Sequence, residues 1–166
     1  MPGMTIVRKF EFGNHNTYYM KKVLQIANLL LQKAKDESCG EELMTNLKLQ
    51  KMLYYEQGFH LAYFGTPLFD DDIEAWQYGP VVPFVYNYFK KNGANGLVPD
   101  GNLYAFSNQK EKELFDEVFR VYGKYSAIGL MNMTHNEKPW KSAGTPCVGN
   151  VISQDSLKSF FQTRLA

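Results

Sequence analysis

One helical segment, residues 46–63, is apolar on almost every side, and this feature constrains the fold more than any other. Thr45 is expected to cap its N-terminus, and Gly65 and Pro67 end it. Only narrow polar strips remain between its apolar residues. The apolar residues are Leu49, Met52, Leu53, Tyr55, Phe59, Leu61, Ala62 and Tyr63. A helix without a broad polar face has to be covered by other elements. We therefore expect it to lie in the middle of the fold.

Amphipathic segments that can cover this helix occur on both sides of it in the sequence. The spacing of apolar residues predicts further helices over 18–36, 83–91, 108–122, 126–138 and 153–165. Residues 73–76 alternate between apolar and polar, which indicates a short strand, and 103–106 are its expected partner. The predicted fold class is therefore mainly α, a single compact helical domain of about six helices with a small antiparallel β-hairpin.

The length and composition of the chain favour one domain. It has 166 residues, of which 45% are hydrophobic, enough to bury a substantial core. No repeat or linker divides it, so we assign 18–166 to one domain and 1–17 to an N-terminal extension. Ile6 and Phe10 lie in that extension, which could dock on the domain or on a partner.

Charge and apolar patterning argue against nucleic acid and against a membrane. The 18 Lys and Arg residues nearly balance 17 Asp and Glu residues, and a net charge of +1 gives little attraction to phosphate. No apolar run approaches the ~18–20 residues that a membrane span needs. Cys39 and Cys147 are far apart and no signal pattern starts the chain, so a cytoplasmic location is expected.

The chain lacks the usual sequence signs of a metal site, a cofactor site or a catalytic centre. The three histidines, His15, His60 and His135, form no His-x-x-x-His pair, and no Cys-x-x-Cys pair occurs. Neither pattern of a Gly-rich phosphate loop is present. We therefore expect no metal, no cofactor and no enzymatic activity. A small hydrolase that uses His135 with Cys147 or Glu137 stays an alternative.

Three motifs give the sequence a family resemblance. The first is TNLKLQKMLYY at 45–55, followed by QG at 57–58 and PLF at 67–69. The second is IEAWQYGPVVP at 73–83, and the third is THNEKPW at 134–140. In this order they resemble the motifs of the Panacea domain, the SocA-like or GepA-like family, over roughly 18–161. The chain departs from the common family pattern at Glu56, Phe59 and Gln77.

The resemblance implies a role in a toxin–antitoxin system. A member of this family is expected to neutralise a cognate toxin protein by binding it directly. A second possibility is a proteolytic adaptor that delivers the bound toxin to a protease or unfoldase. A nucleic-acid-binding regulator and the small hydrolase are more distant alternatives, and a homo-oligomer is compatible with each of these functions.

The residues that we expect to bind the partner, or to line a signature pocket, come from these motifs. They are Lys51, Tyr54, Tyr55, Gln57, Trp76, Tyr78, Gly79, Pro80, His135, Pro139 and Trp140. Five of them are predicted to form one pocket: Tyr55, Trp76, Tyr78, His135 and Trp140. Structural roles are the alternative, because a tight turn explains Gly79 and Pro80, and the end of a helix suits His135.

Overall fold

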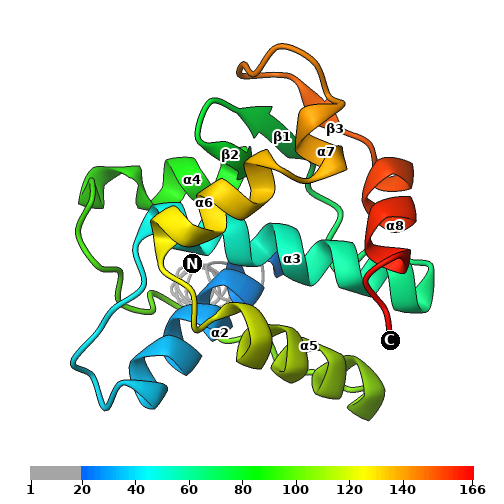
Figure 1. Cartoon of the computed structure of the whole chain (residues 1–166). Coiled ribbons are helices and arrows are strands. Elements are labelled where there is room, and N and C mark those ends of the chain that lie inside the picture. The colour runs from blue at the N-terminus through cyan, green and yellow to red at the C-terminus, as the bar shows by residue number, and fades with distance from the viewer. Residues whose placement is uncertain (1–19) are drawn as a thin grey trace, which may run out of the picture.

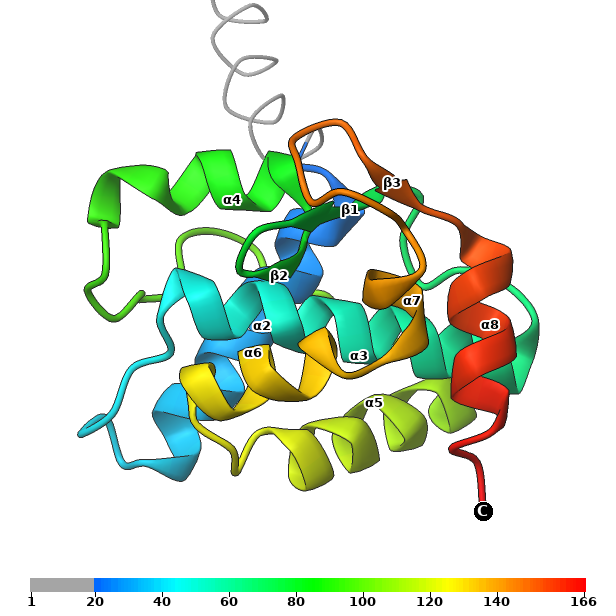
Figure 2. The same cartoon turned by 45° about the horizontal axis from the view of Figure 1, so that its top comes forward.

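Helix α3, Asn46–Phe64, runs through the middle of the fold, with other elements on all sides of it (Figure 1, Figure 2). Every residue from Leu49 to Ala62 is buried. The Thr45 side chain accepts a hydrogen bond from the Lys48 amide, and Gly65 ends the helix with a φ of 77°. The prediction of a central helix is therefore confirmed, together with both of its ends.

The computed structural model describes residues 20–166. The predicted extension, 1–17, lies outside the described residues. Within the described part, no helix has both the length and the apolar character needed to cross a membrane. The same part contains no group of three or more His, Cys, Asp and Glu side chains placed to hold a metal ion.

The described residues contain seven α-helices and one short 3-10 helix, and the mainly helical class is confirmed. Besides α3, they are α2 (Lys22–Glu37), α4 (Pro83–Phe89), η1 (Lys90–Asn92), α5 (Gln109–Tyr122), α6 (Ala127–His135), α7 (Lys138–Lys141) and α8 (Gln154–Gln162). The additional helix is α7. Pro139, expected to end the helix that precedes it, lies instead in the first turn of α7, where a missing amide hydrogen is tolerated.

A three-stranded antiparallel sheet covers one end of this helical body. β1 (Ile73–Trp76) pairs with β2 (Gly79–Val81) through a two-residue turn, and its other edge pairs with β3 (Val151–Ile152). The expected pairing of β1 with 103–106 is wrong, because both edges of β1 are already occupied. The amide of Tyr104 instead donates to the Gln25 carbonyl on α2, at 3.1 Å.

Candidate functional site

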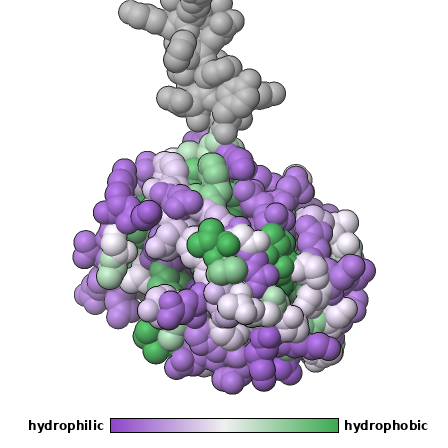
Figure 3. Space-filling model, turned by 90° about the horizontal axis from the view of Figure 1, so that it is seen from above, coloured by the Kyte–Doolittle hydropathy of each residue, from purple (hydrophilic) through white to green (hydrophobic). Residues whose placement is uncertain are grey.

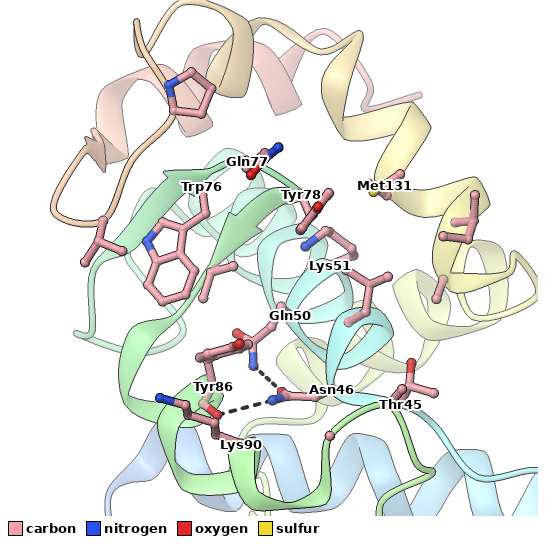
Figure 4. A pocket seen from close by; sticks show the side chains of 18 of the residues that line it. Thr45, Asn46, Gln50, Lys51, Trp76, Gln77, Tyr78, Tyr86, Lys90 and Met131 are labelled. Atoms are coloured by element: carbon pink, nitrogen blue, oxygen red, sulfur yellow. Dashed lines mark hydrogen bonds between the residues drawn. The ribbon is translucent and has the colours of Figure 1, made fainter.

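A groove of about 890 Å³ lies beside the first half of α3. Its walls come from α3, the β1–β2 turn, α4, α6 and the loop 146–148 (Figure 4). The main apolar side chains of the lining are Leu47, Trp76, Tyr78, Tyr86, Ile128 and Met131. A volume of this size can accept several side chains of another molecule.

Apolar side chains at the rim of the groove are exposed to solvent. Tyr78 on the β1–β2 turn is 62% exposed, Ile128 on α6 is 56% exposed, and Val148 in the 146–148 loop is 75% exposed. Apolar side chains also interrupt the mainly polar face seen from above in Figure 3. Exposed apolar residues from three separate elements around one hollow are typical of a surface that contacts another protein.

Two amide side chains hold the walls of the groove together. Asn46 Nδ2 donates to the Tyr86 carbonyl at 3.2 Å, and Gln50 Nε2 donates to Asn46 Oδ1 at 2.8 Å (Figure 4). Gln50 Oε1 accepts from the amide of Val82 at 2.9 Å. These bonds tie the start of α3 to α4 and to its N-cap residue, Val82, and so connect two walls of the groove.

Lys51 and Gly79 meet where α3 passes the hairpin. The Lys51 ammonium is fully buried and donates to the Pro80 carbonyl at 3.0 Å. Burial lowers the pKa of Lys51 to about 7. Gly79 has a φ of 105°, and a Cβ there would lie 2.6 Å from Lys51 Cε and 2.9 Å from Thr134 Oγ1. Only glycine therefore fits between the hairpin and the lysine.

Tyr54, Tyr55 and Glu137 form a second polar cluster, away from the groove. The Tyr54 hydroxyl donates to Glu137 Oε1 at 3.1 Å, and the Tyr55 hydroxyl donates to both carboxylate oxygens at 3.0 and 3.1 Å. Burial raises the pKa of Glu137 to about 6, although the two hydroxyl donors act in the opposite direction. The cluster fixes the start of α7 against the centre of α3.

His135 and Trp140 link this cluster to the sheet. Their ring centroids are 4.2 Å apart, and Trp140 Nε1 donates to the Trp76 carbonyl at 2.8 Å. His135 Nε2 is buried and has no hydrogen-bond partner within residues 20–166. Pro139, which precedes Trp140 in α7, is buried.

Gln57 has a structural position. Its Oε1 accepts from the amides of Leu68 and Phe69, and its Nε2 donates to the Phe69 carbonyl at 2.7 Å. This side-chain amide thus makes three hydrogen bonds to the loop after α3, and only one of its N–H groups is not used there. Gln57 therefore anchors that loop and does not reach the groove.

The structure distributes the five residues of the predicted pocket between two places. Trp76 and Tyr78 line the groove. Tyr55 is fully buried against Tyr122, with ring centroids 4.1 Å apart, and His135 and Trp140 pack on each other. A direct role of any of them in partner binding stays a prediction.

The sequence interpretation did not include several groove residues: Tyr86, Ile128, Met131 and Val148. A signal was present for Ile128, because it is an apolar residue off the buried face that Leu130 and Thr134 define on α6. No local signal marks Val148, whose loop reaches the groove only through tertiary packing.

The structure does not bring together the residues that the hydrolase alternative requires, which are His135 with Cys147 or Glu137. The Glu137 carboxylate is engaged by two tyrosine hydroxyls, and Cys147 is exposed in its loop. Within residues 20–166, His135 makes no hydrogen bond to either of them. A nucleophile activated by a base requires such a contact.

The raised pKa of Glu137 predicts a pH dependence of stability. Its folded-state pKa of about 6 exceeds its ordinary value of 4.5, so the folded state holds the proton more tightly. This stabilisation is present below pH 4.5 and is lost as the pH rises to 6, a change of about 2 kcal/mol. Urea unfolding of Glu137→Gln between pH 4 and 7 should lack this part of the slope. An identical slope in both proteins would contradict the assignment.

Comparison with known proteins gives a family match over the same segments. The model of the family "Antitoxin SocA-like, Panacea domain" matches residues 49–141, inside the predicted domain 18–166. The protein "Antitoxin SocA" of Caulobacter vibrioides (strain NA1000 / CB15N) is 33% identical over 127 residues, covering 69% of this chain and 66% of that protein. The chain thus spans slightly less than two thirds of this relative. No solved structure matches the chain significantly. The chain belongs to the SocA-like antitoxin family that carries the Panacea domain.

Proposed function

We propose that this chain is an antitoxin that neutralises a cognate toxin protein by binding it directly. Family membership carries the proposal, because the family model covers 49–141 and the curated relative at 33% identity is named an antitoxin. The residues of the match include most of α3, the β1–β2 hairpin and all of α6, which form three walls of the groove. We assign the groove as the surface that contacts the toxin.

The chemistry of the groove supports a binding role. Trp76, Tyr78 and Tyr86 combine a large apolar ring with a polar group, and aromatic residues of this kind are enriched in the parts of interfaces that contribute most affinity. The bonds from Asn46 and Gln50 connect two walls of the groove before any partner arrives. A preformed apolar surface loses little conformational entropy when it binds.

Co-expression tests this proposal in cells. Expression of the protein encoded by the adjacent gene should arrest growth, and co-expression of this chain should restore growth and yield a complex on purification. The account is contradicted if the neighbouring protein is harmless alone, or if growth returns without any association of the two proteins.

The same cells separate direct holding from proteolytic delivery. If holding is sufficient, protected cells retain full-length toxin, and protection persists in strains that lack individual ATP-dependent proteases. Protection that disappears in a protease-deficient strain, with toxin accumulating, would instead assign the adaptor role.

A further inference from the structure

The charged residues of the groove are all of one sign. Its lining contains Lys51 at the floor and Lys90 at the edge, and no Asp or Glu (Figure 4). Glu74 on the adjacent strand β1 is turned to other groups, because its Oε1 accepts from Trp76 Nε1 at 3.0 Å and from the Gly149 amide at 2.6 Å. The hollow is therefore apolar with a positive charge and no counter-charge among its lining residues.

Lys51 is an unusual residue for the floor of such a groove. Its side chain carries three donors when protonated, and the Pro80 carbonyl is its hydrogen-bond partner within the described residues. The ammonium points from α3 toward the turn that carries Tyr78 (Figure 4). Burying a charge without an opposite charge is costly, and a side chain of methionine would fill the same space without that cost.

Among the described residues that line the groove, no carboxylate lies beside Lys51. The ionisable side chains on the hairpin turn, on α6 and across the groove are Tyr78, Tyr86, Lys90, His135 and Cys147, and none is a carboxylic acid. Desolvation is the cause of the lowered pKa of Lys51, with no carboxylate acting against it. Another molecule can supply the counter-charge that the groove lining lacks.

We propose that the groove binds an apolar segment of the toxin that carries a carboxylate, and that Lys51 and Lys90 supply the positive charge that this carboxylate meets. The inference rests on the proposed antitoxin function and adds the chemistry of the partner to it. The chain's own N-terminal residues are a poorer complement, since 1–17 contain Arg8 and Lys9 against Glu11 alone. Tyr78, 62% exposed on a two-residue turn, is the side chain that moves aside to give the carboxylate access to Lys51.

Pairing with a carboxylate has a consequence that a purely structural lysine would not show. Free Lys51 is mostly neutral at pH 8, because burial holds its pKa near 7. A carboxylate beside it favours the charged form and returns the pKa toward its ordinary range. Binding at pH 8 is then accompanied by uptake of about one proton.

Calorimetry of the full chain with the purified protein encoded by the adjacent gene measures this uptake. Titrations at pH 8 in two buffers of different ionisation enthalpy should give different binding enthalpies. For uptake of about one proton, the difference should equal about the difference between the two buffer ionisation enthalpies. Lys51→Met should remove the uptake and weaken binding roughly 10-fold or more. Lys90→Gln should weaken binding and keep the uptake.

Lys110→Gln is the matched control, because Lys110 is an exposed lysine in the first turn of α5 and does not line the groove. It should change neither affinity nor proton uptake. Thermal unfolding of Lys51→Met checks its fold, and this variant should unfold at a higher temperature than the original chain, since its folding does not require an ammonium group to leave water or lose its proton.

Each outcome has a distinct meaning. Absence of binding by the original chain would overturn the proposed antitoxin function itself. Tight binding without proton uptake, unchanged in Lys51→Met, would be compatible with the antitoxin function. It would contradict the pairing of a toxin carboxylate with Lys51. The chain alone could also form a dimer that the Lys90→Gln substitution dissociates. This result would show that a second copy of the chain occupies the groove, and it would contradict binding of a toxin segment there.

Discussion

Gly79→Ala is expected to lower the free energy of unfolding by about 2–5 kcal/mol. The φ of 105° is unfavourable for any residue with a Cβ, which costs about 1–2 kcal/mol. The added methyl would also lie 2.6 Å from Lys51 Cε and 2.9 Å from Thr134 Oγ1, and overpacking of this kind costs about 1–3 kcal/mol. Urea unfolding at constant pH measures the sum.

Gly144→Ala separates these two contributions. Gly144 has a φ of 94°, and a Cβ there has no atom within 4 Å. It should therefore show only the backbone cost of about 1–2 kcal/mol. Equal losses in the two variants would contradict the tight contact between the hairpin, α3 and α6 that defines one side of the groove.

Tyr78→Asp combined with Ile128→Asp is expected to weaken toxin binding roughly 100-fold or more, and to abolish protection of cells. Both side chains are more than half exposed at the rim, so their loss should change the interface and leave the core intact. Side chains that anchor an interface commonly contribute about 2 kcal/mol or more each when they are removed, and a buried carboxylate adds a desolvation cost. Surface-immobilised toxin gives the dissociation constants.

Tyr63→Asp is the control for this effect. Tyr63 is 58% exposed, close to the value for Tyr78, and it lies in the last turn of α3, outside the groove. It should bind and protect as the original chain does. If the groove variant still protects, or if Tyr63→Asp fails equally, the toxin uses another face of the molecule.

The central part of the fold could be predicted from the sequence because its signals are local. The absence of a polar face marked α3 as central, and Thr45, Ser126 and Ser153 each cap the helix expected after them. The pairing of β1 could not be predicted. β3 has only two residues, too few for an alternating pattern, and it reaches β1 from far along the chain.

The candidate site could be predicted only in part, because it also depends on contacts between elements that are far apart in the sequence. The motif residues are brought close to α3, but several serve to hold the fold: Gln57 anchors a loop and Gly79 makes room for Lys51. The groove itself arises from the meeting of α6 and the loop 146–148 with the hairpin. Such a surface depends on how remote elements pack, and sequence periodicity reports only which face of each element is buried.

The buried polar residues of α3 show the same limit of periodicity. The narrow polar strips of the sequence contain Lys51, Glu56 and His60, and all three are buried in the fold. His60 Nε2 lies 2.7 Å from Glu111 Oε1. Glu56 Oε2 has no hydrogen-bond partner in the part of the chain that the structure describes, and burial raises the pKa of Glu56 well above its usual value. Partners for such groups come from other elements, which the sequence pattern of one helix does not contain.

The central claim is that a complex of fixed stoichiometry, and not a reaction, neutralises the toxin. Sedimentation velocity of the two purified proteins, mixed at increasing ratios without any protease, tests it most directly. The account predicts a new, faster species that saturates at a fixed molar ratio, with the toxin intact inside it. It is contradicted if the two proteins sediment separately at every ratio while substoichiometric amounts of this chain still inactivate the toxin.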